Sequence, residues 1–127
     1  EARVLGDLSL NHIIPVATHY QSMIAKDVQN LMVIYGAEKG KKLSERIMNI
    51  IEQISERTAV IEENVEAMVE ARKVANKIQN EREKAIAYHD TVETFFQPIR
   101  YQIDKLELVV ADELWSLPKY RELLFVR

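Results

Sequence analysis

One stretch without Pro or Gly, from Lys41 to about Ile78, limits the folds open to this chain more than any other feature. Its apolar residues recur at alternating steps of three and four, the spacing of a helix with one buried side. The series comprises Leu43, Ile47, Ile50, Ile54, Thr58, Ile61, Val65, Met68 and Ala75. A helix of roughly 37 residues is about 55 Å long, more than the width of a compact globule of this size. The sequence therefore predicts a helix over 41–78 with long partners beside it.

A second helix is predicted over 8–35, where apolar residues again repeat at helical spacing. They are Leu10, Ile13, Ala17, Tyr20, Ile24, Val28, Leu31 and Tyr35. Gly36 follows where a helix would end in a left-handed turn. Pro15 lacks an amide hydrogen and its ring clashes with the carbonyl of Asn11, so we expect a bend near the start of this helix.

The link from Gly36 to Lys42 reads GAEKGKK. A phosphate-binding loop would need a longer Gly pattern after a strand, followed by Lys and Ser or Thr. No strand is predicted before this link, so a solvated turn is the better interpretation.

A third helix is predicted over 80–112 from two interleaved series of residues seven apart. One series is Ile78, Ala85, Val92, Ile99 and Leu106, and the other is Arg82, His89, Phe96, Ile103 and Val110. His89 falls on this seam, where it could be a ligand or a core residue bonded to a neighbour, and the core residue is the better interpretation. Pro98 is expected to kink the helix. No Gly or Pro marks a turn near Asn80, so a hairpin and a single rod of about 70 residues are both open; compact packing favours the hairpin.

The tail from Asp112 to Arg127 is unusually rich in large apolar residues, and Pro118 suits the first turn of a short helix over 117–124. We expect it to form an interface, either capping the bundle or docking on something outside this chain. The candidate interface residues are Trp115, Leu117, Pro118, Tyr120, Leu123, Leu124 and Phe125.

The expected fold is all-α, an antiparallel up-down-up bundle of three long helices with a short C-terminal helix. Among 127 residues there are only 3 Gly and 3 Pro, too few for the many tight turns of an all-β fold. A chain of this length is expected to form one helical-bundle domain over 1–127. Because it opens at Glu1 rather than Met, we expect a fragment of a longer chain or a processed product.

Charge and composition argue against several classes of function. A net charge of -3 does not favour a nucleic-acid partner, which usually requires a surplus of Lys and Arg. The absence of Cys removes disulfides and thiolate chemistry and suits a cytoplasmic protein. No apolar run is long enough for a membrane span, and no signal peptide is predicted.

No catalytic, cofactor-binding or metal-binding residue can be assigned from the pattern. His12 and His19 are seven apart, which on a helix is about 10.5 Å and too far for one metal ion. The Glu-x-x-His motif of di-metal bundles is absent. Glu62, Glu63, Glu66 and Glu70 are better interpreted as a solvated face than as an acid/base pair.

Three stretches resemble the C-terminal region of type III glutamine synthetases, the large bacterial form of that enzyme. They are ARVLGDLSLNHIIPVA at 2–17, EARKVANKIQNEREKAIAYHDTV at 70–92 and DKLELVVADELWSLPKYRELLF at 104–125. The tail is the most specific of the three, because helix formation does not dictate its Trp, Pro, Tyr and Phe. Ser116 and His89 depart from the family pattern, in which Pro is frequent at the first position and His is not constant at the second.

The resemblance implies a parent enzyme that forms glutamine from glutamate, ammonia and ATP with a divalent metal, Mg or Mn, in stacked hexameric rings. Its metal and nucleotide ligands would lie upstream, and none maps onto this chain, so the fragment is expected to be inactive alone. Expected partners are the parent's catalytic domain and neighbouring subunits. The alternative is a free-standing helical coiled-coil interaction protein; a metal protein built inside the bundle is a third, weaker reading.

Overall fold

A computed structural model describes residues 1–110, which are helical almost throughout and contain no strand. Three helical runs follow one another along this part of the chain. The first is α1 (Ala2–Leu8), the π-helical turn η1 (Ser9–Ile13) and α2 (Ile14–Leu43); the second is α3 (Glu45–Asn76); the third is α4 (Glu81–Ala87), the π-helical turn η2 (Tyr88–Val92), the 3₁₀ turn η3 (Glu93–Phe95) and α5 (Phe96–Val109). The all-α prediction is confirmed. The short helix predicted over 117–124 lies outside the described residues.

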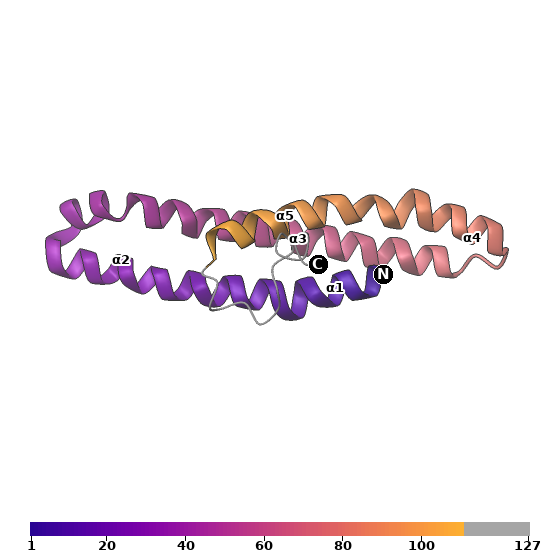
Figure 1. Cartoon of the computed structure of the whole chain (residues 1–127), viewed down its shortest axis with the longest axis horizontal. Helices are drawn as coiled ribbons and strands as arrows, with labels where there is room; N and C mark the ends of the chain where they lie inside the picture. The colour runs from indigo at the N-terminus through magenta and orange to yellow at the C-terminus, as the bar shows by residue number, and fades with distance from the viewer. Residues whose placement is uncertain (111–127) are drawn as a thin grey trace, which may run out of the picture.

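The helix α3 is the element against which the others pack, and the chain reverses at each of its ends (Figure 1). On one side, Gln21 of α2 donates from Nε2 to the carbonyl of Ile51 at 2.9 Å and to Oγ of Ser55 at 2.7 Å. On the other, Arg57 of α3 donates from Nη1 to Oε1 of Gln102 in α5 at 3.1 Å. Residues far apart in sequence are thereby held side by side along the long axis.

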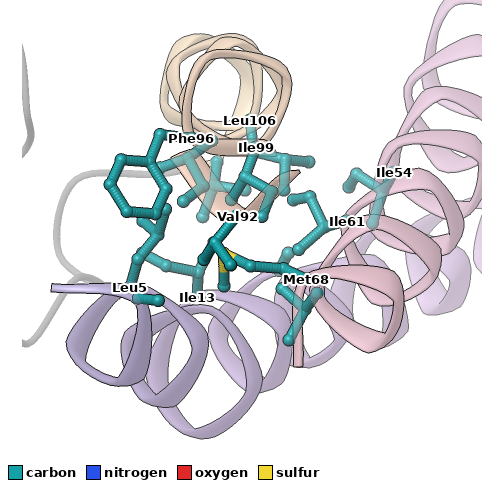
Figure 2. Close-up of a cluster of buried hydrophobic side chains, with 14 of the residues drawn as sticks. Leu5, Ile13, Ile54, Ile61, Met68, Val92, Phe96, Ile99 and Leu106 are labelled. Carbon is teal, nitrogen blue, oxygen red and sulfur yellow. The ribbon is translucent and has the colours of Figure 1, made fainter. Parts of the chain in front are cut away.

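The core is the apolar stripe of α3 enclosed by α1, η1, η2 and α5, as Figure 2 shows. Ile54, Ile61 and Met68 have no exposed area, and each such side chain contributes about 1.5–3 kcal/mol through burial. The other buried apolar residues are Ala2, Leu5, Ile13, Ala17, Ile24, Val65, Ala75, Val92, Phe96, Ile99, Ile103, Leu106 and Val110. Most of the stripe predicted over 41–78 is buried from Ile54 onward, whereas Ile47, Ile50 and Thr58 are half-buried and Leu43 at its start is exposed.

The first helical run begins at Ala2, earlier than the expected residue 8, because Ala2 and Leu5 are buried and anchor the opening turn. The bend expected at Pro15 takes the form of the π-helical turn η1, in which the amide of Ile14 bonds to the carbonyl of Ser9. A π turn inserts one residue and relieves the clash between the Pro15 ring and the preceding turn. The insertion exposes Leu10, which the sequence had placed on the buried side, and buries Ser9.

The link between the first two runs is more compact than a solvated turn. Gly36 has φ +84° and interrupts the helix where the sequence predicted an end. The chain nevertheless continues in helical turns to Leu43 and reverses at Ser44. Gly40 is buried against Met32, and a Cβ there would lie 2.7 Å from the Met32 Cα. Gly40 is therefore required for the close approach of the link to the backbone of Met32.

The prediction that His89 lies in the core is wrong. His89 is exposed and lies beside Glu93, at 3.8 Å between Nδ1 and Oε2. The cause is η2, whose inserted residue shifts the register by one. From Val92 onward the residues predicted to be buried are buried. Before Val92, Lys84 and Tyr88 are half-buried, whereas Ala85 and His89, which were predicted to be buried, are exposed.

A real turn separates the second and third runs at residues 77–80. Asn80 has an extended backbone, and its Oδ1 accepts a hydrogen bond from the amide of Glu83 at 3.0 Å. This is an N-cap, which starts a new helix without Gly or Pro. Of the two arrangements left open by the sequence, the hairpin is the one the chain adopts (Figure 1).

Candidate docking groove between α1 and α3

A groove of about 510 Å³ lies between the start of the first helical run and the C-terminal half of α3. It exists because α1 presents small residues to α3. A Cβ on Gly6 would lie 3.6 Å from Cγ1 of Val65 and 3.8 Å from Cε of Met68, so larger residues at this position would fill the space. The lining residues are Ala2, Arg3, Val4, Gly6, Asp7, Leu10, Asn11, Val65, Met68, Val69 and Arg72.

The groove has an apolar floor, and two exposed apolar side chains stand beside it. Val65 and Met68 form the buried floor, while Val4 is 71% exposed and Leu10 46% exposed on the α1 side. Large apolar side chains that stay accessible beside a hollow are typical of a surface that binds another polypeptide. The arrangement can therefore hold one or two apolar side chains of a partner.

Arg72, which lines the groove, has a buried side-chain donor that makes no hydrogen bond to any described residue. Its Nε is buried and has no hydrogen-bond partner within residues 1–110. An unsatisfied buried donor is unfavourable, and a guanidinium is best satisfied by a carboxylate. Asp7, the acidic residue among those that line the groove, already accepts a hydrogen bond from Nδ2 of Asn11. The groove thus suits an apolar segment that also carries an acidic group.

Among residues 1–110, no cluster of three or more His, Cys, Asp or Glu could hold a metal ion. His12 and His19 are both exposed, and of the four glutamates at 62–70, Glu70 pairs with Lys73 at 3.5 Å. No helix in this part of the chain is long and apolar enough to cross a membrane.

The interface residues predicted from the sequence all lie outside the described residues. They are Trp115, Leu117, Pro118, Tyr120, Leu123, Leu124 and Phe125. The sequence analysis did not predict the groove. One feature of the sequence pointed to it, because the small residues Ala2 and Gly6 are four apart and would share one face of a helix. Its recognition also required Val65 and Met68 opposite that face, and the sequence alone does not give this pairing.

No protein-family model matches the chain. It is 45% identical over 127 residues to a protein named glutamine synthetase from Bacteroides fragilis (strain YCH46). It is 25% identical over 127 residues to the type-3 glutamine synthetase of Dictyostelium discoideum. Each match covers 100% of this chain, which spans 17% of the length of each of these curated relatives. The resemblance of this piece to type III glutamine synthetases is confirmed.

Proposed function

We propose that this chain is the C-terminal structural and assembly module of a type III glutamine synthetase. The observation that carries the proposal is the similarity along all 127 residues to 17% of the length of a glutamine synthetase. The chain corresponds to a small share of that enzyme. Residues 1–110 also contain no cluster of His, Cys, Asp or Glu that could hold a metal ion. We therefore infer a structural role for this part of the protein.

In this proposal the longer protein is a cytoplasmic bacterial enzyme that forms glutamine from glutamate, ammonia and ATP. The nucleotide and its divalent metal, Mg or Mn, would be bound by the part of the protein that precedes this chain. No residue of the 127 is assigned to them, and the module alone is expected to have no activity.

The proposed architecture of the module is an antiparallel up-down-up bundle. Its support is the order of the bonds between helices: Gln21 meets Ile51 and Ser55, and Arg57 meets Gln102. The ion pair of 2.9 Å between Arg100 and Glu1 ties the third run to the first. Such a bundle is a rigid support for a neighbouring interface.

The proposed interface is the tail from Trp115 to Phe125, docked on the catalytic domain of the same protein or on a neighbouring subunit. Two observations on the described residues support a role in assembly. Val33 and Ile34, near the end of α2, are 84% and 68% exposed, and the α1–α3 groove leaves further apolar area uncovered. Uncovered apolar surface at separate places is typical of a module that is partly buried in a larger assembly.

The test uses the longer protein with Trp115→Ala and Phe125→Ala combined. We expect a lower melting temperature and reduced glutamine-forming activity, because large aromatic side chains dominate the energetics of interfaces. Tyr101→Ala is the matched control, since Tyr101 is an aromatic residue of α5 that is 54% exposed. Melting temperature and kinetics that match the control would contradict the proposal.

A further inference from the structure

We propose that one stripe of the tail, made by Leu117, Tyr120 and Leu124, packs on an apolar face that α2 and α3 of the same chain leave open beyond the end of α5. The inference rests on the proposed function, in which the tail is an interface. It adds which side of the tail this chain holds and which side is left for a partner.

The third helical run ends part-way along the pair formed by α2 and α3. Figure 1 shows that, among residues 1–110, the left-hand part of this pair has no third helix beside it. The last described residue, Val110, is only 3% exposed. The tail therefore leaves the bundle from a fixed point at the edge of the uncovered part.

Two contacts of α5 bracket the level of that point along α3. Since the chain reverses at 77–80, the bond between Arg57 and Gln102 puts Val110 level with about residue 49. The ion pair between Arg100 and Glu1 puts it level with about residue 61, because α1 packs beside the later part of α3. On either count, the part of α3 that leads back to residue 43 extends beyond α5.

The stripe of α3 that faces α5 continues into this uncovered part. Leu43, Ile47 and Ile50 follow one another at steps of four and three, and the same steps lead on to Ile54 and Arg57. Ile54 has no exposed area and Arg57 bonds to α5, whereas Leu43 is 48% exposed and Ile47 and Ile50 are half-buried. The stripe thus loses its cover beyond the end of α5.

Met23 of α2 lies on the same side of the pair. Residues two apart on a helix point to nearly opposite sides, which applies to Gln21 and Met23 and also to Ser55 and Arg57. Gln21 bonds to Ser55, whereas Arg57 bonds to α5. Met23 therefore points away from the Gln21–Ser55 bond and toward the side on which α5 lies.

The same side of α2 carries Leu31 and Ile34, eight and eleven residues after Met23. Met23 is 45% and Ile34 68% exposed, and Leu31 is half-buried. Asp27, four residues after Met23, is an exposed acid between them. We call this surface, with Leu43, Ile47 and Ile50 of the other helix, the open face.

The tail of the same chain can reach the open face. Leu43, at its far end, lies at most about 27 Å from Val110 along the axis. The six residues 111–116 span up to about 20 Å when extended, and the predicted helix over 117–124 adds about 12 Å. A tethered segment within reach has an effective concentration on the order of millimolar, so the face is filled by its own tail in preference to that of a second copy.

The tail also matches the open face in chemistry. Leu117, Tyr120 and Leu124 follow one another at steps of three and four, the spacing of one apolar stripe on a helix. Arg121, four residues after Leu117, lies beside this stripe and has the charge opposite to that of Asp27. Such a pair favours one direction of packing.

Trp115 and Phe125 fall outside this stripe on a helical projection. In the proposed packing they are turned away from α2 and α3, where a partner can reach them. The tail is then held by its own bundle on one side and meets the rest of the assembly on the other.

A nitroxide label on Lys119→Cys tests the packing, because the 127-residue chain has no Cys of its own. We expect the methyl NMR signals of Ile34 and Leu43 to lose most of their intensity relative to the reduced label. The signals of Val4 and Leu10, beside the α1–α3 groove, are the control and should keep theirs. Isotope-labelled chains mixed with unlabelled, nitroxide-bearing chains should show no loss.

Three results would overturn the inference. They are loss of intensity at Val4 and Leu10 in place of the open face, loss that appears only in the mixed sample, and no loss at any methyl group. The first would place the tail at the groove, and the second would place it on another copy.

A second measurement separates the two sides of the tail. In the 127-residue chain, Leu117→Ala combined with Leu124→Ala should lower the melting temperature by at least about 5 °C, because apolar contacts with the open face are lost. Trp115→Ala combined with Phe125→Ala is the matched control and should lower it by less than about 2 °C. Equal shifts for the two pairs would contradict the assignment of the sides.

Failure of this inference differs from failure of the proposed function. If Trp115→Ala with Phe125→Ala weakens the longer protein but the label finds no contact on the open face, the proposed function stands and only this inference fails.

Discussion

At the scale of single residues, two glycines within helices have opposite surroundings. A Cβ on Gly40 would lie 2.7 Å from the Cα of Met32 and 2.9 Å from the carbonyl oxygen of Leu31, so the backbone of the link would have to move. A Cβ on Gly6 would make only ordinary contacts with Val65 and Met68. The same substitution should therefore change the free energy of unfolding in opposite directions.

We predict that Gly40→Ala lowers the free energy of unfolding by about 1–3 kcal/mol, the usual cost of overpacking. Gly6→Ala should raise it by about 0.5–1 kcal/mol, because alanine loses less conformational freedom than glycine when a helix forms. Urea denaturation of the two variants measures both effects. A stabilised Gly40→Ala variant would show that the link does not pack on Met32 as described.

The buried stripe of α3 gives a second prediction at this scale. Ile61 has no exposed area, and Ile61→Ala should lower the free energy of unfolding by about 2–5 kcal/mol through the cavity that it leaves. Val74→Ala is the control on the same helix: Val74 is 64% exposed, and its loss should cost at most about 0.5 kcal/mol. Similar midpoints of thermal unfolding for the two variants would contradict the assignment of the core.

At the scale of helices, the start of α4 depends on a single cap. The side chain of Asn80 accepts the bond from the amide of Glu83, so Asn80→Ala should lower the free energy of unfolding by about 0.5–2 kcal/mol. Asn80→Asp, which keeps the accepting oxygen, should restore most of it. Gln79→Ala is the control, because Gln79 is the exposed residue next to the cap. Equal free energies of unfolding for Gln79→Ala and Asn80→Ala would contradict a stabilising cap at Asn80.

Sequence periodicity predicted the helices well wherever they are regular. In α3 the predicted residues from Ile54 onward are buried except Thr58, and Val92, Ile99 and Leu106 of the third run are buried too. The prediction failed at the two π-helical turns, where one inserted residue exposed Leu10 and His89. The first of these turns precedes Pro15 and the second precedes Pro98. A proline in the sequence indicates that a helix is disturbed, but it does not indicate by how many residues the helical register shifts.

The groove was less predictable than the fold for a related reason. A small residue such as Gly6 becomes the wall of a groove only when the side chains opposite it are known. The residues that face Gly6 depend on the position of α1 along α3. Contacts between residues far apart in sequence, such as Leu5, Ile13 and Met68 in the core, determine that position (Figure 2). The tail, which carries the predicted interface residues, lies outside the described residues.

At the scale of the whole molecule, the described part is a long helical body built around α3, with apolar surface left uncovered at the groove and near the end of α2. The body has a packed apolar core of its own. Uncovered apolar area on a well-packed body is typical of a surface that another polypeptide covers.

The most direct measurement of the proposed assembly role is sedimentation velocity of the longer protein proposed above, with and without residues 113–127. The account predicts that removal of the tail shifts the protein to smaller species, because the main proposed contact between subunits is lost, while circular dichroism reports the same helix content. A truncated protein that sediments as the same assembly and keeps the same kinetics would contradict the account.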